Sequence, residues 1–512
     1  MKVLLHGGTV LTSDGTVSAL ATDGGTVAWL GDDDRAAAYD GADEVVDLQG
    51  ALVAPAFVDS HLHLVQTGRL LDGLDLSGCS DKDDLLGRVA AHVAARPGDA
   101  VVIGAGWDET RWPERTLPTA DELERVAPGR RLYLSRVDGH SAIVSHALLA
   151  ETPQVITQEG WAATGRLERR AKHTVSDKLA DLDGPEQRLD AARRAVASLA
   201  AHGVGAFHEN AAPHIGPEYE LDLVRRAAAE GGLHVTAYWG ELGAFDKVER
   251  LGVSGLAGDL VADGAVGSRT AAMTDAYADL DGHCGHGYLD AIQIADHVVG
   301  CTERGLQGGF HCIGDAALAA VEEGFARAAE RVGADAVRAA RHRLEHCEMP
   351  SPEAIEVFAR LGVVASVQPM FDGLWGGPEG MYAERLGHRW EAMNPFATLA
   401  GAGVAVAFGS DSPVTSPEPW GAVRAAVHHQ NPAFRMSPRD AFAAHTAGGW
   451  HAAGLDGRGR IAVGAAATYA VWSPTAGLDA HGLPVLEPGA DLPLCLRTVV
   501  DGRTVFPHQE HT

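Results

Sequence analysis

Short apolar runs alternate with segments of helical periodicity over most of the chain. Eight runs have the length and composition of buried strands, and they are Val53–Ser60, Val204–Glu209, Leu233–Trp239, Asp259–Asp263, Gly308–Ile313, Arg341–Cys347, Val363–Pro369 and Val404–Ser410. Strands that alternate with helices form a parallel sheet, and eight such units predict a closed (β/α)8 TIM barrel. A doubly wound open sheet is the alternative, but no glycine-rich nucleotide-binding motif follows a predicted strand.

Both ends of the chain have a different pattern, in which short strands are separated by glycine-containing turns. Val3–His6 near the start and Leu496–Val500 near the end are examples. Because chain termini often lie close together, strands from both ends can share one sheet. We therefore predict a small composite β-sandwich from residues 1–52 and 455–512, and a barrel from residues 53–454.

The connection between the first two predicted barrel strands is too long for a single helix. It contains two further apolar runs, Val101–Trp107 and Arg131–Val137, which have the composition of strands. We therefore predict an insertion at about residues 65–200, and such segments often carry substrate contacts.

Composition and charge narrow the class of protein. Hydrophobic residues make up 46% of the 512 positions, which allows a large buried core. The formal net charge of −28 argues against nucleic acids and anionic membranes as partners, because both require a basic face. Without a signal peptide or an apolar run of about 18 residues, we expect a cytoplasmic protein with a small-molecule partner. The six scattered cysteines predict free thiols, and the sequence leaves open whether the chain forms a homo-oligomer.

Four histidines and an aspartate stand at the ends of predicted strands. They are His61 and His63 in the first strand region, His311 in the fifth, His346 in the sixth and Asp411 after the eighth. Side chains two residues apart on a strand point the same way, so the first two histidines are directed together. In a TIM barrel the carboxyl ends of the strands form the active site. Imidazoles and carboxylates are ligands for Zn2+, so these five residues predict a divalent metal site.

Seven short motifs carry a resemblance to a known family. They are Pro55–His63, Gly106–Asp108, Arg136–His140, Asp263–Ala271, His311–Asp315, Arg343–His346 and Gly409–Pro413. Together they resemble the amidohydrolase superfamily, specifically the branch called amidohydrolase family 3, which includes YtcJ-like and N-substituted formamide deformylase-like proteins. The resemblance covers nearly the whole chain. It implies a (β/α)8 barrel with a composite β-sandwich, and an enzyme that hydrolyses amide or other C–N bonds with a metal-activated water.

The ligand set and the resemblance also suggest roles for individual residues. One or two divalent ions, with Zn2+ expected, would activate the attacking water. Asp411 would carry its proton to the leaving amine, and His346 would bind a second ion or donate to the developing oxyanion. N-acyl or N-formyl amines are the expected substrates. The candidate substrate contacts are Trp107, His140 and Arg269; the alternatives are a core position for the tryptophan and an ion pair with Asp263 for the arginine.

One position departs from the family pattern. Relatives of this branch usually carry a lysine four residues before Asp263, where its carboxylated form bridges two metal ions, but this chain has Asp259. The aspartate side chain is several bonds shorter, so we expect it not to reach the bridging point without a backbone shift. A single-metal site would then favour a deaminase of a cyclic amidine, and a non-catalytic binding or regulatory homologue is the alternative from another class. Glu209 is a further candidate ligand, although a surface position is favoured.

Overall fold

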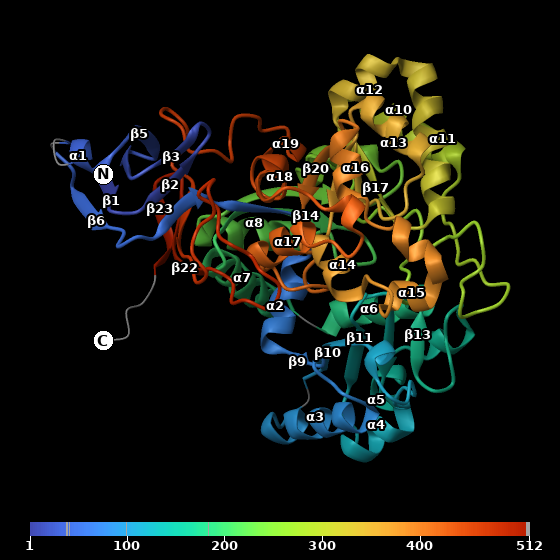
Figure 1. Cartoon of the computed structure of the whole chain (residues 1–512). Coiled ribbons are helices and arrows are strands. Elements are labelled where there is room, and N and C mark those ends of the chain that lie inside the picture. Colours follow the sequence, from blue (N-terminus) through green and yellow to red (C-terminus); the bar gives the residue numbers. More distant parts are fainter. Residues whose placement is uncertain (37–38, 40, 99, 183, 508–512) are drawn as a thin grey trace.

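Eight parallel strands form one sheet at the centre of the protein (Figure 1). The structure is a computed structural model that describes residues 1–36, 39, 41–98, 100–182 and 184–507. The strands lie side by side in sequence order as β8 (Phe57–Leu62), β14 (Val204–Ala211), β15 (His234–Trp239), β16 (Gly255–Leu256), β17 (Gln307–Cys312), β18 (Arg343–His346), β19 (Val364–Val367) and β20 (Ala405–Phe408). The predicted (β/α)8 barrel is therefore confirmed.

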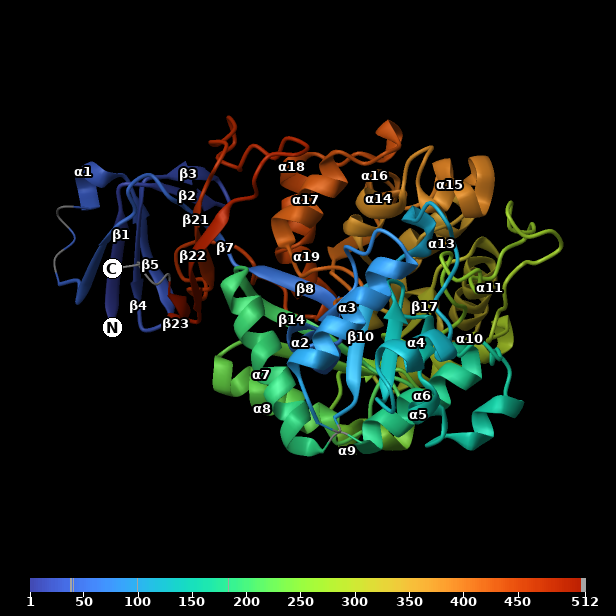
Figure 2. The ribbon, with the colours of Figure 1, turned by 90° about the horizontal axis from the view of Figure 1, so that it is seen from below.

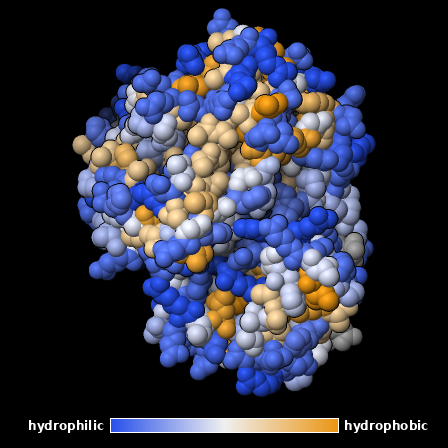
Figure 3. Space-filling model, turned by 90° about the vertical axis from the view of Figure 1, so that its right-hand side faces the viewer, coloured by the Kyte–Doolittle hydropathy of each residue, from blue (hydrophilic) through white to orange (hydrophobic). Residues whose placement is uncertain are grey.

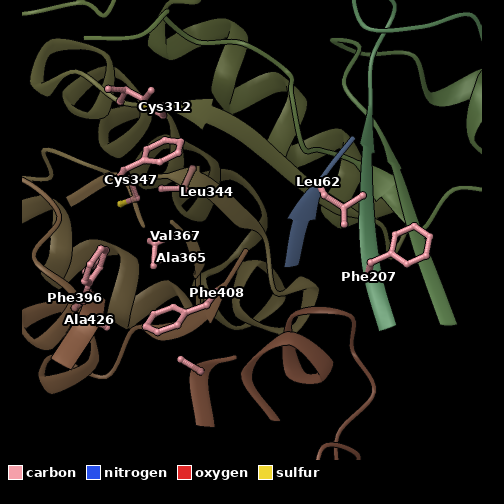
Figure 4. Packing of buried hydrophobic residues seen from close by; sticks show 14 of the residues in the cluster. Leu62, Phe207, Cys312, Leu344, Cys347, Ala365, Val367, Phe396, Phe408 and Ala426 are labelled. Carbon is pink, nitrogen blue, oxygen red and sulfur yellow. The ribbon is translucent and has the colours of Figure 1, made fainter. Parts of the chain in front are cut away.

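Helices surround the barrel (Figures 1 and 2). The longer ones are α2 (Leu64–Asp72), α7 (Pro185–Ala201), α8 (Glu220–Gly231), α10 (Ala291–Glu303), α11 (Asp315–Val332), α13 (Pro352–Leu361) and α17 (Pro419–Val427). Buried apolar side chains of strands and helices form one large core, and Figure 4 shows part of it, including Leu62, Phe207, Leu344 and Phe408. Of the helices in the described ranges, none is long and apolar enough to span a bilayer.

The carboxyl end of the first strand, β8, meets the segment just beyond the last strand, β20. The Asp411 amide donates to the His61 carbonyl at 2.7 Å, and Leu62 and Ser412 form an isolated parallel bridge. Gly409 makes this approach possible, because a Cβ atom there would stand 2.5 Å from the His61 amide nitrogen. Closure of the barrel therefore places two of the predicted metal ligands, His61 and Asp411, beside each other.

Two of the predicted barrel strands are wrong in their extent. The run predicted as Val53–Ser60 is divided at Ala56 between β7 (Leu52–Pro55) and β8, which belong to different sheets. Both halves are apolar, so periodicity alone cannot separate them. The strand predicted at Asp259–Asp263 instead lies at Gly255–Leu256 as β16. Gly258, at φ +75°, ends it, and the chain continues irregularly with one bridge between Val261 and His311.

Strands from both ends of the chain form the smaller β-domain at the left of Figure 1. One sheet has the order β5 (Thr26–Gly31), β4 (Ala19–Asp23), β1 (Lys2–His6) and β6 (Glu44–Asp47). The other has the order β23 (Arg503–Pro507), β22 (Leu494–Val500), β21 (Tyr469–Ser473), β7, β2 (Thr9–Thr12) and β3 (Gly15–Val17). The composite character predicted from the sequence is confirmed, and β7 carries this sheet beyond residue 52. Residues 508–512 of the predicted C-terminal part lie outside the described residues.

The insertion forms a lobe of its own below the barrel in Figure 1, and the outline narrows between the two parts in Figure 3. Its sheet has the order β13 (Arg166–Glu168), β12 (Ser141–Val144), β11 (Leu132–Arg136), β10 (Val102–Trp107) and β9 (Leu74–Asp75). The helices of the lobe include α3 (Lys82–Ala95), α4 (Ala120–Val126), α5 (His146–Leu149) and α6 (Arg169–Leu182). The six cysteines are free, as the sequence predicts.

We expect Gly409→Ala to destabilise the fold, because the new Cβ would force the ends of β8 and β20 apart. Overpacking of this kind costs about 1–3 kcal/mol, so the midpoint of thermal unfolding should fall by several degrees. Gly401→Ala, in α16 (Phe396–Gly401), is the matched control, since its Cβ would meet nothing within 4 Å. Equal midpoints for both variants and the wild type would contradict this account of closure.

Candidate metal centre

The five predicted metal ligands lie together at the carboxyl end of the barrel, and Asp259 joins them. Each residue has a nitrogen or oxygen atom in at least one of three compact groups, within which these atoms lie within 4.8 Å of one another. The groups are His61, His63 and Asp259; His61, His346 and Asp411; and Asp259, His311 and His346. Five of the six side chains are at least nine-tenths buried, and the sixth, Asp259, is 13% exposed. Their polar atoms are therefore largely away from bulk water.

Two carboxylates and two imidazoles converge most closely. The Asp411 Oδ1 atom lies 3.3 Å from His61 Nε2 and 3.2 Å from His63 Nε2. The Asp259 carboxylate lies 3.4 Å from each of the same two nitrogens. Ligands about 2.1 Å from a tetrahedral ion are about 3.4 Å apart, so this spacing suits a shared Zn2+. His61 Nε2 and Asp259 Oδ1 are also buried without a hydrogen-bond partner among the described residues, as expected of atoms that bind an ion.

Asp259 reaches this site, which the sequence analysis expects only together with a shift of the backbone. Its carboxylate contacts the His61–His63 pair and lies 3.9 Å from His311 Nδ1 on the other side. The backbone after β16 is irregular here: Gly258 has a positive φ, and Gly240 leaves room beside the Asp259 carbonyl. A Cβ on Gly240 would stand 2.5 Å from that carbonyl carbon. The short acidic side chain thus reaches the site from an irregular stretch of backbone.

Hydrogen bonds fix the orientation of two of the imidazoles. His61 Nδ1 lies 2.9 Å from Glu345 Oε2, and His346 Nδ1 lies 2.8 Å from Gln368 Oε1. Each Nδ1–H can donate to its oxygen, which leaves the Nε2 lone pair directed at the site. Burial alone would raise the pKa of Glu345, but the Arg343 guanidinium and His61 hold it well below its usual range. Glu345 therefore accepts as a carboxylate.

The charge states of the imidazoles differ across the site. Burial lowers the pKa of His311 to about 4 and that of His346 well below its usual range, so both are neutral. Burial also opposes protonation of His61 and His63, but the carboxylates of Asp259 and Asp411 raise the pKa of both. A metal ion at this point would replace those protons as the partner of the carboxylates.

The backbone turns sharply at two of these residues. His346 has φ +67° and Asp411 has φ +54°, a region that residues other than glycine enter rarely. Such conformations persist where the surrounding structure imposes them, and they are common at functional sites.

Glu209 is buried, so the expectation of a surface position is wrong. It lies in β14, and its Oε2 accepts a hydrogen bond from the Leu64 amide at 2.9 Å. Burial raises its pKa to about 7. Its carboxylate supports the turn after β8, and it does not belong to any of the three ligand groups.

A cavity of about 400 Å³ opens above the six residues, and five of them line it: His63, Asp259, His311, His346 and Asp411. Of the predicted substrate contacts, His140 lines this cavity, with its ring centroid 5.5 Å from that of His311. The other two lie elsewhere. Trp107 is fully buried in the core of the inserted lobe, where Nε1 donates to the Leu134 carbonyl. Arg269 does not line the cavity and pairs with Asp279 at 2.6 Å, not with Asp263.

The sequence prediction did not include one wall of the cavity. This wall is formed by α6, and the lining side chains Arg169, Lys172, His173, Ser176 and Leu179 belong to one face of that helix. Their spacing of three and four residues is visible in the sequence. The helical pattern alone does not show which element the face covers.

Comparison with known proteins gives consistent results. A family model described as "Amidohydrolase family" matches residues 44–506. The chain is 27% identical over 552 aligned positions to the putative amidohydrolase YtcJ of Bacillus subtilis, with 99% of both chains covered. It is 24% identical over 422 positions to N-substituted formamide deformylase of Arthrobacter pascens, which covers 74% of this chain and 75% of the relative. An uncharacterized metal-dependent hydrolase from Pyrococcus horikoshii OT3 has a similar fold, with a TM-score of 0.74, 24% identity, and 96% and 100% coverage.

We expect Asp259→Asn to weaken metal binding, because it removes a charge from the convergent ligand set while keeping the side-chain volume. Affinity for Zn2+ should fall at least about tenfold, measured by competition with a chelator. Glu209→Gln is the matched control, because it alters a buried carboxyl group beside the site that is outside the ligand groups. If both variants bind Zn2+ as the wild type does, Asp259 is not a ligand.

Proposed function

Because the chain belongs to the amidohydrolase family, we propose that it is a metal-dependent hydrolase that cleaves an amide or related C–N bond in a small molecule. The observation that carries this proposal is the convergence of His61, His63, Asp259 and Asp411 at 3.2–3.4 Å, with the last three lining the cavity. Such spacing suits a divalent ion, and Zn2+ is the metal we propose.

The chemistry of the donors fits this ion. His61, His63, Asp259 and Asp411 would hold it, and His311 and His346 would either complete a second site with Asp259 or face the substrate. When bound, the ion lowers the pKa of a water molecule towards about 7 and polarises a carbonyl group.

The residues around the ion have separate roles in this proposal. Burial alone would raise the pKa of Asp411, but His61 and His63 hold it well below its usual range, so this residue is ionised. In the proposed reaction its carboxylate would take the proton that the attacking water loses. From there the proton can pass to the nitrogen of the leaving amine. His346 donates its Nδ1–H to Gln368 and presents its Nε2 lone pair to the site, so with Asp259 and His311 it would hold a second ion.

The shape of the site supports a small acyl group. A recess of about 30 Å³ lies beside the cavity, and its lining includes His346, Phe371, Trp375 and Tyr382. This space suits a formyl or acetyl group, whereas the larger cavity suits the amine portion. We therefore propose N-formyl or N-acyl amines as substrates, in agreement with the name of the Arthrobacter relative.

The alternatives depend on Asp259. The absence of the usual bridging lysine favours a deaminase of a cyclic amidine. The aspartate at that position would also be compatible with a non-catalytic homologue. The carboxylate of Asp259 within the ligand set weakens both arguments.

A screen of N-formyl and N-acetyl amines, scored by release of free amine, tests the proposal. We expect chelation to abolish hydrolysis and added Zn2+, Mn2+ or Fe2+ to restore it. Asp411→Asn should lower kcat by about 10²–10⁴, because a proton carrier is lost. Asp456→Asn, which alters a carboxylate paired with Arg341 before β18, is the control and should leave kcat unchanged.

Two results would contradict the proposal. Protein that binds no metal and gains no activity with any of the three ions would exclude a metal-dependent hydrolase. Release of ammonia from a cyclic amidine, with no amine released from any formamide or acetamide, would favour the deaminase.

A further inference from the structure

Helix α6 presents one continuous face to the cavity. Arg169, Lys172, His173, Ser176 and Leu179 all line it, and their spacing places them on one side of a helix. The helix is held at its first residue and near its middle. Its first residue, Arg169, turns the chain from β13 with φ +47°, and Tyr133 on β11 lies within hydrogen-bond distance (3.3 Å) of Ser176 through its hydroxyl.

Lys172 brings an unmatched positive charge to this wall. Arg169 pairs with Glu159, and Arg136, which also lines the cavity, is held by three carboxylates. Within the part of the chain that the structure describes, no carboxylate pairs with Lys172, and no group accepts a hydrogen bond from its ammonium. The chain has a net charge of −28 and therefore many carboxylates that could form an ion pair with a lysine. The lack of such a pair sets Lys172 apart from Arg169 and Arg136.

Neutral histidines surround this charge. The His173 and His214 ring centroids are 5.1 Å apart, and the His140 ring centroid lies 5.5 Å from that of His311. Burial lowers the pKa of His140 and of His173 to about 4, and the positive charge of Lys172 acts in the same direction. These imidazoles can exchange hydrogen bonds with a ligand, but they do not add charge at neutral pH.

The rest of this part of the cavity is apolar. Leu70, Ile103, Leu179 and Ile215 are among its lining residues. A ligand in this cavity therefore meets hydrocarbon and the Lys172 ammonium as well as the metal centre.

We propose that Lys172 binds a carboxylate of the substrate away from the metal centre, so that the preferred substrates are acylated amines whose carboxylate is separated by several bonds from the scissile amide. The proposal rests on the hydrolase function proposed above. It makes Lys172 a specificity-determining residue that does not take part in bond cleavage.

A matched series of compounds tests this proposal on the metal-loaded enzyme. The series consists of N-formyl derivatives of 3-aminopropanoate, 4-aminobutanoate and 6-aminohexanoate, each compared with its neutral carboxamide. We expect kcat/KM for the best carboxylate to exceed that of its carboxamide about 10- to 100-fold, as is typical of a charge-assisted hydrogen bond. Lys172→Met should remove this preference by raising KM for the carboxylate alone. The kcat for the carboxamides should stay at the wild-type level.

Lys178→Met is the matched control, because Lys178 is on the same helix, is not in the cavity lining and lies 3.8 Å from Glu151. It should keep the preference for the carboxylates. Equal kcat/KM for both members of every pair in the wild type would overturn the proposal. A preference that survives Lys172→Met would overturn it too, since the carboxylate would then bind elsewhere, for example at the metal.

Calorimetric titration with 6-acetamidohexanoate and its carboxamide separates this proposal from the proposed reaction. If neither series is hydrolysed but the carboxylate binds about tenfold more tightly than the carboxamide, and only when Lys172 is present, the subsite stands and the reaction is wrong. If the wild type and Lys172→Met bind 6-acetamidohexanoate equally, the subsite is wrong whatever the reaction.

Discussion

The hydrogen bond from the Asp411 amide to the His61 carbonyl closes the barrel, and the candidate metal site depends on it. Without this contact, ligands from the first and last strands would not share one point. The Asp59 carboxylate strengthens the same junction, because its Oδ1 accepts hydrogen bonds from the amides of both His61 and Ser410. Burial raises the pKa of Asp59 to about 6. Its hydrogen bonds to the two amides satisfy polar groups that are buried at this junction.

A buried ion pair inside the barrel extends this arrangement. Arg343 and Glu345 are fully buried, and burial of charges is costly unless each is paired and hydrogen-bonded. Arg343 donates to Glu345, to the Ser60 carbonyl and to Ser366, while Glu345 holds His61. The pair therefore connects β18 to β8 and β19 and sets the orientation of one ligand. The pair therefore has a positioning role in addition to any contribution to the stability of the fold.

The sequence predicted the parts of the site that follow from strand periodicity. His61, His63, His311, His346 and Asp411 each lie at the end of an apolar run, and a parallel barrel brings such ends together. It failed where the backbone departs from regular geometry. The reach of Asp259 depends on the irregular chain after β16 and on space at Gly240, and neither is visible in a hydrophobic pattern. The sequence also left the roles of Trp107 and Arg269 open, because a motif identifies a residue but not the direction of its side chain.

The division at Ala56 has a consequence for how the protein loses its structure. One residue separates β7, in the terminal sheet, from β8, which carries His61 and His63. Local opening of the terminal sheet would free the start of the strand that presents these two ligands. Unfolding of the small domain would therefore be coupled, through a single residue, to the strand that carries two of the candidate metal ligands.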